Sequence, residues 1–97
     1  MNIRFLTLAQ KEVDECVRWY DERANLGRGF LDELDRGVRL IKSHPLASTE
    51  IDSGIRRCLL HRSPYALNLR HRGDTIVAIA VAHLHRTPRY WSDRIDE

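Results

Sequence analysis

The hydrophobic pattern of this chain changes its period once, near residue 54, and this change constrains the fold more than any other feature. Before it, apolar residues recur every three or four positions, as on one face of an α-helix. After it, branched apolar residues form short runs separated by turn residues, as in β-strands. A helical part followed by a strand-rich part predicts an α+β fold, with the helices covering one face of a sheet.

Two amphipathic helices are expected in the first part. One apolar stripe runs through residues 7–24 and a second through residues 30–41. Thr7 and Gln10 have the spacing of a capping box, so the first helix is expected to begin there. The charged residues of this segment, Glu12 included, occupy the remaining faces of the helix.

The breaks between these segments predict how the helices are connected. Residues 25–29 contain two glycines and predict a short loop, so the helices should pack as an antiparallel hairpin. Pro45 disfavours helical geometry at His44 and should end the second helix. Residues 46–54 show no periodicity and are expected to form a loop.

Four strands are expected. Alternation at residues 2–6 predicts the first, and the runs 55–62, 65–70 and 75–83 predict a meander with a hairpin turn at residues 72–74. The last run is apolar on both sides, which is typical of a central strand with the N-terminal strand beside it. The prediction is a single domain over residues 1–97 of order β-α-α-β-β-β, with a two-helix hairpin on one face of a mostly antiparallel four-stranded sheet.

Membrane and disulfide functions are not expected. The longest apolar run, residues 76–82, is shorter than the roughly 20 residues that cross a bilayer, and the N-terminus lacks a signal-peptide pattern. Cys16 lies on the first helical stripe and Cys58 in a predicted strand, so both should be buried free thiols. The sequence therefore predicts a soluble cytoplasmic protein with no membrane partner.

The charge is divided unevenly along the chain. Residues 1–54 carry eight Lys or Arg and ten Asp or Glu, whereas residues 55–97 carry eight Arg and four Asp or Glu. The two parts thus have formal charges of −2 and +4. An anionic partner is expected at the second part, with a solvated basic face as the alternative.

The tail, residues 81–94, reads Val-Ala-His-Leu-His-Arg-Thr-Pro-Arg-Tyr-Trp-Ser-Asp-Arg. With the order of expected elements, it resembles the RelE/ParE superfamily of toxins from bacterial toxin–antitoxin operons. Over essentially the whole chain, further short motifs are similar to this family: Trp19-Tyr20, Gly27–Leu31, His44-Pro45, Gly54–Arg57 and Ser63–Tyr65.

The resemblance implies the toxin of a type II toxin–antitoxin system of the plasmid stabilisation type. Such a toxin is neutralised in a hetero-oligomer with its cognate antitoxin. ParE-like members inhibit DNA gyrase, whereas RelE-like members are endoribonucleases that cleave messenger RNA on the ribosome. The third alternative is a degenerate member that only binds antitoxin.

Ribonuclease chemistry requires a proton acceptor, cations for the phosphorane and a proton donor for the leaving oxygen. The candidate catalytic residues for this activity are Arg57, His85, Arg86 and Tyr90. RelE-like enzymes place lysines on the sheet, and the predicted strands here contain none. This departure favours the ParE-like alternative, so whether the chain is an enzyme stays open.

For a binding function, the expected target-binding residues are Arg56, Arg62, Arg86 and Arg89, and the sequence leaves open whether Arg56 or Arg57 faces solvent. His83 and His85 could share a metal, but no third ligand stands at a motif spacing, so neither a metal nor a cofactor is expected. Trp91 is expected in the core, and the arginines are expected beside the tail.

Overall fold

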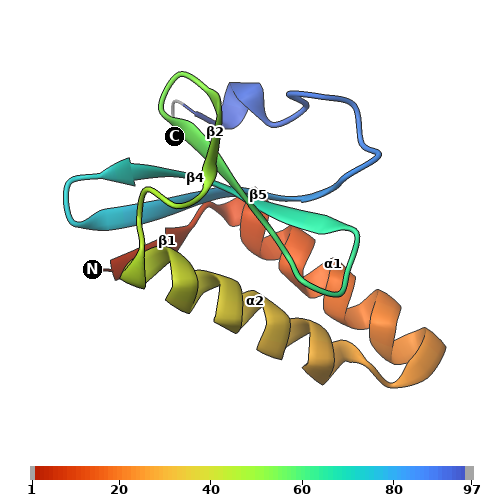
Figure 1. The fold of residues 1–97 in the computed structure, drawn as a ribbon. Helices are drawn as coiled ribbons and strands as arrows, with labels where there is room; N and C mark the ends of the chain where they lie inside the picture. The colour runs from red at the N-terminus through yellow and green to blue at the C-terminus, as the bar shows by residue number, and fades with distance from the viewer. Residues whose placement is uncertain (1, 96–97) are drawn as a thin grey trace.

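The computed structural model describes residues 2–95, and in it both helices lie on the same side of a five-stranded sheet (Figure 1). The α+β class and the order of the predicted elements are confirmed. The sheet has the strand order β1-β5-β4-β3-β2, in which β1 runs parallel to β5 and the other neighbours are antiparallel. The elements are β1 (Asn2–Phe5), α1 (Thr7–Ala24), α2 (Gly27–Ser43), β2 (Thr49–Asp52), β3 (Ile55–Leu59), β4 (Tyr65–Arg72), β5 (Thr75–His83) and the 3₁₀-helix η1 (Ser92–Arg94).

The strand β2 corrects two predictions, the loop over residues 46–54 and the count of four strands. It is a short edge strand paired antiparallel with β3, and its first three residues are exposed. A strand formed by backbone pairing without burial leaves no apolar alternation in the sequence. Arg56 of β3 fixes the chain before β2, because its guanidinium donates to the backbone carbonyls of Leu46 and Ser48.

The helix starts also differ from the predictions. Helix α1 does begin at Thr7, but Thr7 is already helical, no side chain caps this end, and the Gln10 amide donates to Asp14 instead (3.1 Å). The prediction of a capping box is therefore wrong. Helix α2 begins at Gly27 within the predicted loop, where the Asp21 carboxylate accepts the Gly27 N–H (2.8 Å). A Cβ at Gly27 would overlap the Asp21 carboxylate, so a larger residue would have to displace this carboxylate from its hydrogen bond.

The central strand β5 contains a bulge that the sequence pattern did not reveal. Val77, Ile79 and Val81 alternate in the sequence, yet the pairing with β4 passes from Ala78 to Ala80 and leaves Ile79 as an extra residue. As a result Val81 faces the helices, whereas Val77 and Ile79 lie on the opposite face. The predicted central position of β5, between β1 and β4, is confirmed.

The sheet therefore has an apolar cluster on each face. The larger cluster lies between the sheet and the two helices. The smaller one lies on the opposite face, where residues 84–95, here named the C-terminal segment, fold back across the sheet (Figure 1). Trp91 of this segment is only 4% exposed and packs in the smaller cluster, which confirms its assignment to the core.

A buried carboxylate joins α2 to the loop between β3 and β4. Glu33 is 8% exposed, and its carboxylate accepts the backbone N–H groups of Arg62 and Ser63, the latter at 3.0 Å. These donors would otherwise have no partner in the loop. Glu33 thus anchors one end of the meander to the helices. No helix within residues 2–95 combines the length and apolarity needed to cross a membrane.

Replacing Glu33 should show how much this anchor stabilises the fold. Glu33→Ala leaves two backbone donors unpaired, so the free energy of unfolding should fall by about 2–3 kcal/mol in urea denaturation. Asp32→Ala is the control, because its exposed ion pair with Arg28 contributes less than about 0.5 kcal/mol. Equal losses in the two variants would contradict an anchoring role for Glu33.

The buried thiols predict a dependence of stability on alkaline pH. Cys16 and Cys58 are free and buried, as expected. Burial raises the pKa of Cys16 from 9.0 to about 11, so the thiol stays protonated in the folded chain while it ionises in the unfolded chain. The contribution of the protonated Cys16 thiol to the free energy of unfolding is fully present below pH 9 and is lost as the pH rises to about 11. The difference in free energy of unfolding between the wild type and Cys16→Ala should therefore shrink by up to about 2 kcal/mol across this range. A difference that does not change with pH would contradict the raised pKa of Cys16.

Candidate functional site

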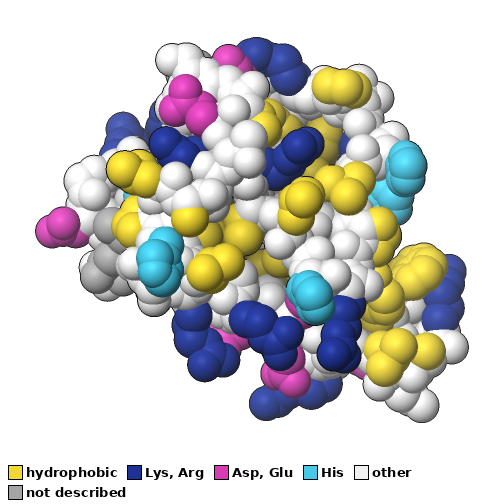
Figure 2. All heavy atoms as spheres, viewed as in Figure 1, with side chains coloured by type: hydrophobic (Ala, Val, Ile, Leu, Met, Phe, Trp, Pro, Cys, Tyr) yellow, Lys and Arg dark blue, Asp and Glu magenta, His cyan; other side chains and the backbone are white. Residues whose placement is uncertain are grey.

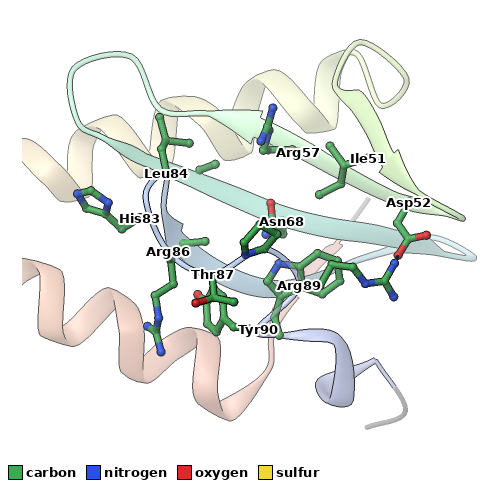
Figure 3. A pocket seen from close by; sticks show the side chains of 14 residues that line it. Ile51, Asp52, Arg57, Asn68, His83, Leu84, Arg86, Thr87, Arg89 and Tyr90 are labelled. Atoms are coloured by element: carbon green, nitrogen blue, oxygen red, sulfur yellow. Dashed lines mark ion pairs between the residues drawn. The ribbon is translucent and has the colours of Figure 1, made fainter.

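A cleft of about 230 Å³ lies on the sheet face opposite the helices, between the ends of β2–β5 and the C-terminal segment (Figure 3). We name it the open-face cleft. Its walls combine apolar and cationic side chains with a single carboxylate. The lining residues are Ile51, Asp52, Arg57, Ala66, Asn68, Ala82, His83, Leu84, Arg86, Thr87, Pro88, Arg89, Tyr90 and Trp91.

The floor of the cleft is formed by β3, β4 and β5. The alanines at 66 and 82 are cross-strand partners whose small side chains leave space above the sheet. Asn68 lies near the centre of the lining residues (Figure 3) and is directly paired with Arg57 across β3 and β4. The guanidinium of Arg57 is exposed and makes no hydrogen bond or ion pair with any residue of the range 2–95. It is therefore available to an anionic partner.

The C-terminal segment forms the opposite wall. Arg89, in the left-handed backbone region with φ of 63°, forms an ion pair with Asp52 of β2 across the mouth of the cleft (Figure 3). The Arg86 guanidinium lies 4.0 Å from the centroid of the Tyr90 ring and 3.9 Å from the Glu12 carboxylate. Of the three arginines that line the cleft, Arg86 and Arg89 are thus partly neutralised by carboxylates of the chain. Arg57 is the least neutralised of the three.

The Glu12 carboxylate of α1 holds this wall in place. It accepts hydrogen bonds from the Val81 backbone N–H (3.0 Å), the Tyr90 hydroxyl (2.7 Å) and the Arg94 guanidinium (2.8 Å). Arg94 also donates to the carbonyl of Ile79 (3.2 Å). Both members of the Glu12–Arg94 pair have side chains only 11% exposed, so the pair is weakly screened by solvent.

This arrangement replaces a missing part of the sheet. β1 pairs only with residues 75–78 of β5, so the edge of β5 beyond them has no neighbouring strand. Glu12 and Arg94 supply the acceptor and donor there. Glu12 lies outside the predicted apolar stripe, yet its side chain is only 11% exposed. Its position, three residues after Ala9 and four before Cys16, places it beside the apolar stripe and was the available signal.

The same contacts fix the chemistry of Tyr90. Burial, followed by the hydrogen bond to Glu12, raises the pKa of its hydroxyl well above the usual 10. The proton is directed to Glu12, and the guanidinium groups of Arg86 and Arg94 lie 4.0 and 5.1 Å from the ring centroid. The hydroxyl proton of Tyr90 is therefore held within the molecule.

The four candidate catalytic residues are only partly brought together. Arg57, Arg86 and Tyr90 all line the open-face cleft, but His85 does not. Its backbone N–H donates to Nδ1 of His83 (3.1 Å), and the two rings lie 5.3 Å apart between centroids. Within residues 2–95, no group of three His, Cys, Asp or Glu side chains could hold a metal ion.

The four expected target-binding residues are likewise divided. Arg86 and Arg89 line the cleft, whereas Arg56 is bound to carbonyls of the loop before β2 and Arg62 lies beside Glu33 and α2. The structure answers the question that the sequence left open, because Arg57 is the exposed arginine of the pair. Sequence reasoning did not select Asn68. The signal that could have identified it is its place as a polar residue in the interior of a strand.

Comparison with known proteins shows similarity in structure alone. No protein-family model matches the chain, and no curated protein matches it. A solved structure, described as "Chromosomal ParDE TA system from P. aeruginosa", superimposes with a TM-score of 0.63 at 17% identity. The superposition covers 86% of this chain and 95% of the matched chain. The chain therefore shares its fold with a protein of that ParDE structure, which agrees with the fold that the sequence resemblance implied.

The role of Glu12 can be tested by removing only its charge. Glu12→Gln should weaken the contacts to Arg94 and Arg86, lowering the free energy of unfolding by about 3 kcal/mol. Amide hydrogen exchange should accelerate in residues 79–81 and in the C-terminal segment before the rest of the sheet. Glu15→Gln, on the exposed side of the same helix, is the control. Unchanged exchange in the C-terminal segment of Glu12→Gln would show that other contacts hold it.

Proposed function

We propose that this chain is the toxin of a type II toxin–antitoxin system, neutralised by a cognate antitoxin, and that it inhibits DNA gyrase in the manner of ParE-like toxins. The observation that carries the proposal is the structural match to the ParDE toxin–antitoxin system, which extends over 95% of the matched chain. The open-face cleft, with its free Arg57, is the proposed surface for the target.

The state of the cleft supports a toxin that acts by binding. A nuclease needs groups free to exchange protons at the substrate. Here the Tyr90 hydroxyl is directed to Glu12, and His85 lies outside the lining of the cleft. Both lysines of the chain, Lys11 and Lys42, belong to the helices and not to the sheet. What remains is a cationic and apolar surface, which suits recognition better than general acid–base chemistry.

Exposed apolar side chains support the antitoxin as a partner. Trp19, Leu26 and Leu40 of the helical hairpin are 48%, 54% and 54% exposed. Figure 2 shows hydrophobic side chains in a band across the visible face, above the charged outer surface of α2. Covering such surface is a usual source of stability in a complex. The excess of arginine after residue 54 would favour an acidic antitoxin segment.

Three assays distinguish the alternatives. Induced expression in a bacterial host should stop growth, and the purified protein should inhibit supercoiling by purified gyrase. Ribosome-dependent cleavage of messenger RNA without an effect on gyrase would replace the proposal with the RelE-like activity. Normal growth together with a stable antitoxin complex would indicate the degenerate, antitoxin-binding alternative.

Arg57→Ala tests the proposed target surface. Because this guanidinium is exposed and has no partner within residues 2–95, its removal should change the free energy of unfolding by less than about 0.5 kcal/mol. The concentration needed for half-inhibition of gyrase should rise about tenfold, which corresponds to about 1.4 kcal/mol of binding energy. Arg72→Ala, at the exposed end of β4, is the matched control. Equal inhibition by wild type and Arg57→Ala would place the target surface elsewhere.

A further inference from the structure

The floor of the open-face cleft contains a buried amide oxygen that has no partner among residues 2–95. Asn68 is 3% exposed, and its Oδ1 atom accepts no hydrogen bond from any residue of the range 2–95. A side-chain amide can donate twice and accept twice, so an unpaired one in the interior is unfavourable for folding. More than nine-tenths of buried polar groups in proteins are paired, which makes this exception informative.

The position of the amide indicates what could pair with it. Asn68 lines the cleft, so a ligand seated there lies against this side chain. Its neighbour across β3 is Arg57, whose guanidinium is unpaired among the described residues, and its neighbour across β5 is Ala80. An amide and a cation therefore lie side by side on the same face of the sheet. A matching ligand presents a hydrogen-bonding amide next to an anion.

We propose that the open-face cleft binds an extended acidic segment of the target protein, in which a backbone peptide group pairs with the Asn68 amide and a neighbouring carboxylate pairs with Arg57. This inference rests on the proposed function, because it assigns the target to this cleft. A peptide group can donate to the unpaired Oδ1 of Asn68 and accept from its N–H₂ group. A carboxylate matches the planar fork of a guanidinium.

Two features of the cleft favour a peptide over a nucleic acid. Proteins that bind single-stranded nucleic acid stack bases on open aromatic faces. In this cleft the Tyr90 ring lies against two guanidinium groups, and Trp91 is 4% exposed. The lining also includes two exposed apolar side chains, Ile51 (37%) and Leu84 (48%). These two side chains suit aliphatic residues that flank an acidic residue.

The size and charge of the cleft agree with this occupant. Its volume of about 230 Å³ is below the range of about 300–1,000 Å³ typical of sites for whole small molecules, but it can hold a side chain and part of a backbone. Asp52 is the single carboxylate among the lining residues and is paired with Arg89. The remaining charge is positive, so an acidic segment improves the electrostatic balance.

The first test separates a ligand-binding amide from a structural one. Asn68→Leu replaces the amide with an apolar group of similar shape, so the free protein should become more stable and its Tm should rise by about 4 °C. The same change should raise the concentration for half-inhibition of gyrase at least tenfold. Asn2→Leu, on the exposed side of β1, is the control. A lower Tm in Asn68→Leu would show that the amide stabilises the fold and would overturn the inference.

The second test observes binding directly. The side-chain N–H₂ resonances of Asn68 can be followed in ¹⁵N-labelled protein during titration with the blocked peptide acetyl-Ala-Leu-Glu-Ala-amide. The resonances should shift with saturation, the Gln analogue of this peptide should bind at least fivefold more weakly, and Arg57→Ala should abolish that preference. Stronger shifts with adenosine 5′-monophosphate would favour a nucleic acid. No shift with the acidic peptide would also overturn the proposal.

Growth assays distinguish failure of this inference from failure of the proposed function. If the wild type does not inhibit growth or gyrase, the proposed function fails, while the titration still reports on the peptide site. If the wild type is toxic and Asn68→Leu is equally toxic, the inference fails and the function stands. Retained toxicity with lost antitoxin binding in Asn68→Leu would assign the cleft to the antitoxin and would also overturn the inference.

Discussion

The Glu12 carboxylate is the interaction on which the open face of the sheet depends. The edge of β5 extends beyond β1, and its backbone groups there need partners. Glu12 accepts the Val81 N–H, and Arg94, bound to Glu12, donates to the strand. The same carboxylate accepts the Tyr90 hydroxyl. One side chain of α1 therefore completes the edge of the sheet and fixes the C-terminal segment that walls the cleft.

A second constraint comes from the bulge at Ile79. Without the extra residue, the alternating branched residues of β5 would all face one side. With it, Val81 packs against the helices while Ile79 packs with Trp91 on the other face. The bulge thus creates an apolar base for the C-terminal segment on the sheet face that the helices leave open. The cleft lies where this covered area ends.

The cleft combines rigid support with unsatisfied groups. Its wall is held by Glu12, and its mouth by the ion pair between Arg89 and Asp52. Its floor, however, carries the Asn68 oxygen, unpaired among the described residues, and the exposed Arg57 guanidinium. Groups that reduce the stability of a free protein are often found where a partner binds. This contrast between fixed walls and an unsatisfied floor motivates the assignment of the cleft to a binding partner.

The sequence by itself determined the α+β class, the helical hairpin, the central place of β5 and the burial of Trp91, because each depends on hydrophobic periodicity or local turn chemistry. Strand β2 and the bulge at Ile79 depend on the register of backbone pairing with the adjacent strand, which leaves no such pattern. The candidate residues were chosen by chemical type, and only the tertiary structure decided that Arg57 and Asn68 share the cleft while Arg56 and His85 do not. Long-range contacts assign each polar side chain its partner, and Glu12 acquired its role through residues about 70–80 positions away.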